Sequence, residues 1–157
     1  MAAPQNDVES LVQKIDQELD RLEHLARARP PESDFFTQVV KSISNVLSAD
    51  SVSLAQITSG DRFVSVAGLH VTAQSPLQMT GDLQASLGNC LQGKEAATLE
   101  LEVDGRRHHV IASKVALSGA IWGALLVAFN DDIDPLIARG CREFLTAVGE
   151  VLEEYLH

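Results

Sequence analysis

Two arginines and two histidines stand side by side within the segment VDGRRHHVIASKV, residues 103–115, of an otherwise acidic chain. Histidines can bind a metal or exchange protons, and arginines can bind phosphate groups. His108 and His109 are adjacent, however, so on a strand they point to opposite faces and cannot chelate one ion together. The preceding Asp-Gly pair predicts a tight hairpin turn. We therefore expect no metal site, with Arg106 and Arg107 exposed at the hairpin tip, one histidine facing the core or a pocket, and the other facing solvent.

The two cysteines, Cys90 and Cys141, are the other candidates for chemistry. They lie far apart and match no metal-ligand spacing, which suits a reducing cytoplasm better than a disulfide-bonded secreted protein. A nucleophilic Cys90 would need a base such as His108 or His109, and the sequence places none beside it. We expect Cys141 to pack in the core. No Ser-His-Asp order, phosphate-binding glycine loop or carboxylate pair stands out, so the sequence predicts no enzyme and no cofactor.

The composition indicates one soluble domain. The chain has 157 residues, 45% of them hydrophobic, and a net charge of −10, which disfavours nonspecific binding to nucleic acid or anionic lipid. Its most apolar stretch, residues 120–129, is about half the length that crosses a bilayer as a helix. The first residues lack the features of a signal peptide. We therefore expect a cytoplasmic protein that neither inserts into membranes nor binds nucleic acid.

Both ends of the chain carry apolar residues at alternating spacings of four and three, the pattern of a seam between helices. In the first segment these residues are Val8, Val12, Ile15, Leu19, Leu22 and Ala26, and in the last segment they are Ile137, Cys141, Phe144, Val148, Val151 and Tyr155. Pro30 and Pro31 end the first helix. The sequence thus predicts an amphipathic heptad helix over residues 1–31 and a domain over residues 32–157 that ends in a long helix.

Between these ends, the apolar period changes from about 3.6 residues to two and back again. A second helix begins with Ser33 as its N-cap, a short helix follows Thr80, and the last helix begins at Asp134, which precedes a proline. The predicted strands are residues 51–57, 62–69, 97–103, 108–117 and 120–129. Helices from both termini that bound an antiparallel sheet make an α+β layered domain.

The strand at residues 120–129 predicts two different faces for the sheet. Alternation places Trp122, Ala124, Leu126 and Ala128 on one face and Ile121, Gly123, Leu125 and Val127 on the other. The terminal helices must pack on one face, and the other face would form the floor of a pocket. The small residues beside Trp122 could leave room for a ligand or for a closely packed helix. Trp122 could equally be an ordinary core residue, as most such residues are.

Three segments resemble a GAF domain, the PAS-related small-molecule sensor fold, over about residues 33–157. DFFTQVVKSISNVLSADSVSLAQI resembles the family's opening helix and first strand, LQASLGNCLQGKEAATLE its short helix ending in a glycine, and HHVIASKVALSGAIWGALLVAF its closing hairpin. The matching residues in the last two segments are Leu83, Leu87, Leu91, Gly93, Glu95, Gly119, Ile121 and Gly123. Gly123 would let its strand pass close to a neighbouring helix or a ligand.

Some positions depart from the family's pattern. Ala116 stands where the family often has proline, and Leu91 follows Cys90 where bilin-binding members have histidine. The asparagine-lysine motif of cyclic-nucleotide-binding members is absent. The resemblance therefore implies the fold but not the family's best-known ligands.

The resemblance implies a five-strand antiparallel sheet with the N- and C-terminal helices packed on one face and a short helix over the other. It implies a ligand pocket near Cys90, His108, Val110, Ala112 and Trp122. It also implies a homodimer through the terminal helices, with an interface of Val12, Ile15, Leu19, Leu22, Phe144, Val148 and Val151. The alternative is that these helices pack only on each other and on their own sheet.

These features predict a non-enzymatic sensory or regulatory module that dimerises and binds a small ligand or a partner protein to control an attached or associated output. A change in the angle or register of the terminal helices would carry the signal, which requires different ligand affinities for two states. The alternative is a protein-interaction or assembly module with a vestigial pocket, because the predicted pocket strands carry few polar residues.

Overall fold

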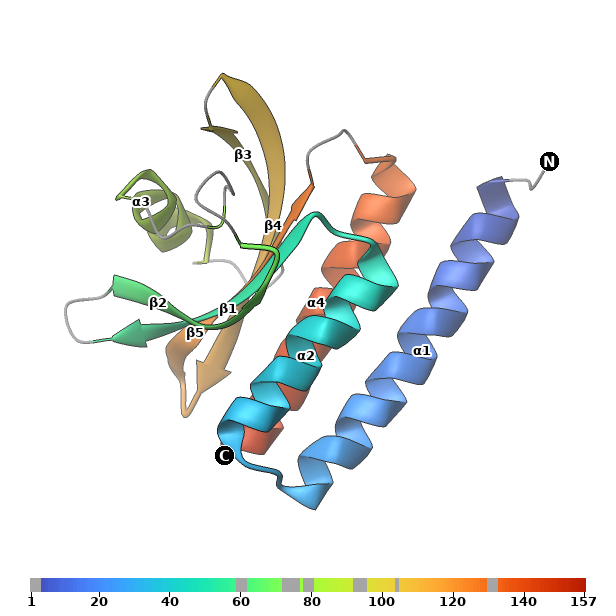
Figure 1. The fold of residues 1–157 in the computed structure, drawn as a ribbon, viewed down its shortest axis with the longest axis vertical. Coiled ribbons are helices and arrows are strands. Elements are labelled where there is room, and N and C mark those ends of the chain that lie inside the picture. The colour runs from blue at the N-terminus through green and yellow to red at the C-terminus, as the bar shows by residue number, and fades with distance from the viewer. Residues whose placement is uncertain are drawn as a thin grey trace.

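A computed structural model describes residues 4–58, 62–71, 77, 81–91, 96–103, 105–129 and 133–157. Helices and strands follow one another along these residues much as predicted (Figure 1). They are α1 (Pro4–Ala28), α2 (Glu32–Leu47), β1 (Ser51–Thr58), β2 (Arg62–Leu69), α3 (Gly81–Cys90), β3 (Ala97–Val103), β4 (Arg106–Leu117), β5 (Ala120–Phe129) and α4 (Pro135–Leu156).

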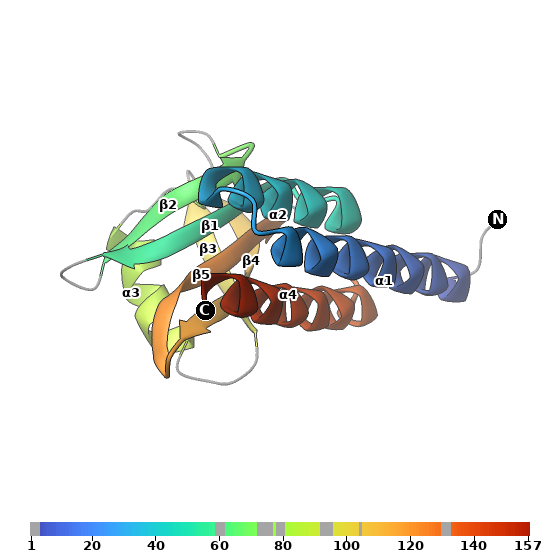
Figure 2. The same cartoon turned by 90° about the horizontal axis from the view of Figure 1, so that it is seen from below.

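The strands form one antiparallel sheet in the order β2-β1-β5-β4-β3. α2 packs on β1 and β2, and α4 packs on β4, on the same face of the sheet. α1 lies over the gap between α2 and α4 as an outer layer and runs parallel to α4 (Figure 2). α3 covers the opposite face. The predicted α+β architecture is therefore confirmed, with the terminal helices on one face and the short helix on the other.

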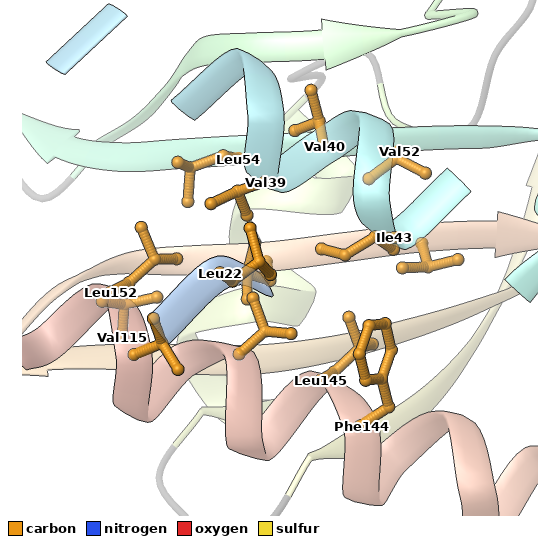
Figure 3. Close-up of a cluster of buried hydrophobic side chains, with 14 of the residues drawn as sticks. Leu22, Val39, Val40, Ile43, Val52, Leu54, Val115, Phe144, Leu145 and Leu152 are labelled. Atoms are coloured by element: carbon orange, nitrogen blue, oxygen red, sulfur yellow. The ribbon is translucent and has the colours of Figure 1, made fainter. Parts of the chain in front are cut away.

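The hydrophobic core on the helical side of the sheet includes α1. Leu22 of α1 is fully buried in a cluster with Val39 and Ile43 of α2 and with Leu145 and Leu152 of α4 (Figure 3). Burial of one leucine side chain stabilises a fold by roughly 1.5–3 kcal/mol. α1 therefore contributes to the same core as the sheet.

Most of the residues expected at a dimer interface are buried within the chain itself. Four of them, Leu22, Phe144, Val148 and Val151, are at most 5% exposed. α1 and α4 of one chain run side by side, so their apolar faces pack on each other and on the sheet. Within one chain, these four side chains are covered by its own helices and sheet. Ile15 and Leu19 are partly buried against the same cluster, and Val12 is 49% exposed.

The predicted N-cap residues of α4 and α2 can be compared with the observed ones, and only that of α4 is confirmed. Asp134 caps α4 as predicted, since its carboxylate accepts a hydrogen bond of 2.8 Å from the Leu136 backbone N–H and a proline follows it. Ser33 is not the N-cap of α2, which corrects the prediction. The extended backbone of Pro31 (φ −56°, ψ 147°) lets the helix begin at Glu32, with no side-chain cap, and leaves Ser33 inside the first turn.

A polar network joins α1 to α2 at Glu18, whose side chain is 25% exposed. The carboxylate accepts a hydrogen bond from the buried Ser42 hydroxyl and pairs with Arg21 Nε at 2.9 Å. Arg21 also donates to Gln38 Oε1 at 3.3 Å. Desolvation by burial raises the pKa of Glu18, but the Ser42 and Arg21 contacts together outweigh it and lower the net pKa below its ordinary value.

Glu18→Gln is expected to reduce the free energy of unfolding at pH 7 by about 1 kcal/mol, because a charged hydrogen-bonded pair is lost. The pKa of Glu18 is lower in the folded chain than in the unfolded chain, so its stabilisation is present above the unfolded value and is lost as pH falls through the folded one. Urea unfolding at pH 7 and at pH 3 should therefore show a larger difference at pH 7 than at pH 3. Glu9→Gln, an exposed change on the same helix, is the control. An equal loss at both pH values would contradict the ionised pairing.

Candidate functional site

The histidine pair lies on β4 with its rings on opposite faces of the sheet, as predicted. By strand alternation His108 lies on the α3 side, 6% exposed, while the His109 side chain lies on the α4 side, 15% exposed and 3.9 Å from the Glu100 carboxylate. His109 therefore does not face open solvent. Arg106 and Arg107 are exposed, but they pair with β3 as part of β4. Among the described residues, no group of three or more His, Cys, Asp or Glu side chains could hold a metal ion.

The sheet face beneath α3 is packed with apolar side chains. Val110 and Ala112 point to this face and are fully buried. The leucines that pack in the same cluster, Leu77, Leu83, Leu87 and Leu91, are each at most 3% exposed. This part of the expected pocket is therefore a close-packed core where these side chains meet. Cys90 is the last residue of α3, and its side chain lies outside the described structure.

Trp122 does not lie on that face. The register of β5 against β4 shifts between Gly123 and Ile121, which leaves Trp122 as the extra residue of a β-bulge. The bulge interrupts the alternation of side chains, so Trp122 turns to the helical face. There it packs on Phe36 of α2, with ring centroids 5.6 Å apart. The alternation that placed Trp122 on the same face as Ala124 was therefore wrong at this residue.

Gly123, next to the bulge, brings β5 unusually close to β1. A Cβ atom on Gly123 would lie 2.0 Å from the backbone carbonyl oxygen of Ala55, a distance that non-bonded atoms cannot adopt. The close approach expected at this glycine is therefore made to the backbone of a neighbouring strand, and not to a helix or a ligand.

An open groove of about 580 Å³ lies between β2, at one edge of the sheet, and α3. Its described lining consists of Thr58, Arg62, Phe63, Val64, Ser65, Val71, Leu77 and Gln84. The Gln84 side-chain carbonyl accepts a hydrogen bond from the backbone N–H of Phe63, and its amide donates to the backbone carbonyl of Phe63, both at 2.8 Å. α3 is thus tied to the backbone of the edge strand, which fixes one wall of the groove.

The groove combines apolar surface with a few polar groups. Phe63 and Leu77 are at most 5% exposed and line it from the core side. The Ser65 hydroxyl lies 3.1 Å from that of buried Ser53. Arg62 is exposed, and within the described part of the chain no acidic side chain forms an ion pair with it. Apolar clefts with a few polar groups are typical of small-molecule sites.

The sequence analysis did not single out these groove residues. Gln84 and Phe63 are 21 residues apart, so no local pattern indicates their hydrogen bonds. The one available signal is that Phe63 is the only aromatic residue of β2 and its one buried residue.

Comparison with solved structures identifies the fold. No family model matches the sequence, and no curated protein does. The chain is similar to the Nlh2 GAF domain of A. aeolicus in an inactive state, at 11% identity and a TM-score of 0.67 over 93% of this chain and 97% of that one. The chain has the GAF fold. It is also similar to the phycoerythrobilin-bound GAF domain from a cyanobacterial phytochrome (12% identity, TM-score 0.65, covering 90% and 96%).

A third GAF domain, from an Acinetobacter phosphoenolpyruvate-protein phosphotransferase, is 15% identical and covers 97% of this chain and 94% of its own, with a TM-score of 0.59. These coverages extend the GAF fold over α1 as well as the sheet. At identities of 11–15% the likeness establishes the fold and carries no ligand over to this chain.

Cys141 of this GAF fold is a core residue, as expected. It is fully buried, and desolvation by burial raises the pKa of its thiol to about 11. The thiol is therefore neutral at physiological pH, and the nucleophilic thiolate is not available there. Among the described helices, none is both long enough and apolar enough to span a membrane.

Proposed function

We propose that this chain is a non-enzymatic sensory or regulatory GAF module that binds a small molecule in the groove between β2 and α3 and passes the change to α1 and α4. The observation that carries this proposal is the groove itself, on the α3 side of the sheet, with α2, α4 and α1 on the other side. A ligand there would contact β2, and α2 packs on β2 and β1. Since α2 also contacts α1 and α4, a shift of these strands would reach the terminal helices through α2. A similar GAF domain is bound to phycoerythrobilin, which supports the capacity of this fold for small ligands.

The lining of the groove favours a mainly apolar ligand that carries an anionic group. Phe63, Val71 and Leu77 offer apolar contacts. The two hydrogen-bonding groups of the Gln84 amide are already used by the β2 backbone. The guanidinium of Arg62 is therefore the charged donor that a carboxylate would meet at the rim.

Hexanoate is expected to raise the melting temperature by about 3 °C at ten times its dissociation constant, and more than hexanol or hexylamine at the same concentration, because binding to the folded chain stabilises it by mass action. Differential scanning calorimetry measures the shift. Arg62→Gln should remove the preference for hexanoate over hexanol. Arg107→Gln, which changes another exposed arginine, in the β3–β4 hairpin, should keep it.

A preference for hexanol, or equal shifts in the Arg62→Gln variant, would contradict the anionic class of ligand while leaving the groove as a binding site. No shift with any of the three compounds would count against the groove.

A second candidate function, an assembly module with a vestigial pocket, is favoured by the packing beneath α3. Val110 and Ala112 are covered there by buried leucines. In this case a homodimer would use apolar residues left exposed on α1 and α4, namely Val12 at 49% and Leu136 at 65% exposure. Concentration-dependent association without a ligand-induced shift would favour this candidate.

A further inference from the structure

The C-terminal end of α4 meets the turn between α1 and α2 at Tyr155 (Figure 1). The Tyr155 hydroxyl donates to the backbone carbonyl of Pro30, and its ring stacks on Phe35 of α2 with centroids 4.1 Å apart. Arg29 Nη1 donates to the backbone carbonyl of Tyr155 at 2.9 Å, and its guanidinium carbon lies 5.3 Å from the ring centroid. One side chain of α4 therefore contacts the turn and α2 together.

Arg29 holds a backbone conformation that is costly for a residue other than glycine. Its φ of 54° lies in the left-handed region, where its N–H bonds the Ala26 carbonyl at 3.1 Å. Such a conformation persists only where the surrounding structure over-determines it. The contacts with Tyr155 hold the Arg29 side chain in place. Opening of this joint would release the backbone strain.

The same joint reaches the sheet through Phe36 of α2. The Phe36 ring stands edge-on to Tyr155 with centroids 6.5 Å apart, and it packs on Trp122, the extra residue of the β5 bulge. Tyr155 is therefore linked by ring contacts to an irregular point of the sheet. Because Trp122 is the only tryptophan of the chain, its fluorescence reports on this neighbourhood.

We propose that Arg29, Pro30, Phe35 and Tyr155 form a latch that holds the ends of α1 and α4 together and opens while the sheet stays folded. In the closed state Tyr155 is 7% exposed and fixes the last turn of α4. In the open state Arg29 relaxes to an ordinary backbone conformation and the last turn of α4 is released. Use of the latch in signalling rests on the proposed function, but its opening is a property of the free chain and needs no ligand.

Native-state hydrogen exchange read by mass spectrometry tests the latch on the free chain. Arg29→Ala and Tyr155→Phe should each speed exchange about tenfold in residues 27–32 and 153–157, with β1 and β5 unchanged, because opening of the joint exposes only those segments. Tyr155→Phe should also make Trp122 more accessible to acrylamide quenching. Lys14→Ala removes an exposed cation from α1 away from this joint and should leave exchange unchanged.

Comparison of Arg29→Gly with Arg29→Ala tests whether the left-handed backbone conformation of residue 29 is strained. Both Arg29 variants lose the guanidinium contacts, but glycine adopts the left-handed conformation without a steric cost, so Arg29→Gly should exchange about threefold more slowly than Arg29→Ala. Faster exchange in the glycine variant would overturn the strained joint. The latch would also be wrong if Tyr155→Phe left both segments unchanged, or if exchange rose equally in β1 and β5.

Discussion

Replacement of Gly123 by alanine is expected to lower the free energy of unfolding by about 3 kcal/mol or more, a large fraction of the stability of an ordinary domain. The new Cβ would meet the carbonyl oxygen of Ala55 at 2.0 Å. That oxygen belongs to β1, which pairs with β5 on one side and β2 on the other, so it cannot move aside without disturbing both ladders. Urea unfolding followed by far-ultraviolet circular dichroism measures the change.

The same substitution at Gly88 of α3 is the matched control. Apart from its chain neighbours and the backbone of its own helix, no atom of the described residues lies within 4 Å of a Cβ at that position, and alanine is favoured over glycine in a helix by about 1 kcal/mol. Gly88→Ala should therefore leave stability unchanged or raise it slightly. If Gly123→Ala unfolded at the same urea concentration as the unaltered chain, β1 and β5 would have to lie further apart than they do in this fold.

Truncation of Leu22 to alanine is expected to cost about 3 kcal/mol of unfolding free energy, because it leaves a cavity between α1, α2 and α4. The lost contacts all lie within one chain, so the destabilisation should not depend on protein concentration. Thermal unfolding over a hundredfold range of concentration measures both the size of the effect and this independence.

Comparison of Val12→Ala with Leu22→Ala distinguishes packing within one chain from association between two copies. Val12 belongs to the same predicted seam as Leu22 but is 49% exposed, so its truncation should change the unfolding free energy by less than about 0.5 kcal/mol. Sedimentation velocity would show whether Val12→Ala weakens a dimer. A loss in Leu22→Ala that disappeared at high protein concentration would instead place Leu22 at an interface between copies.

The candidate site was only partly predictable. The family resemblance implied a pocket near Val110 and Ala112, and both residues lie on the face beneath α3, on the same side because the side-chain period of a regular strand is two. Strand alternation failed at Trp122, because a bulge adds one residue and no local signal marks its place. The groove beside β2 depends on hydrogen bonds between Gln84 and Phe63, which come together only when α3 docks on the edge strand.

The types and order of the helices and strands follow from the sequence alone, because apolar periods of 3.6 and two residues, turn residues such as Asp-Gly, and the Asp134 cap act locally. The heptad patterns that include Leu22 in α1 and Val148 in α4 predict that one face of each helix is buried. They do not predict which element covers that face. The tertiary structure decides that α1 of the same chain fills this role, and that β5 bulges where Gly123 lets it approach β1. Both features depend on contacts between residues far apart in the chain. These contacts form, and stabilise the fold, only when the helices and the sheet have packed together.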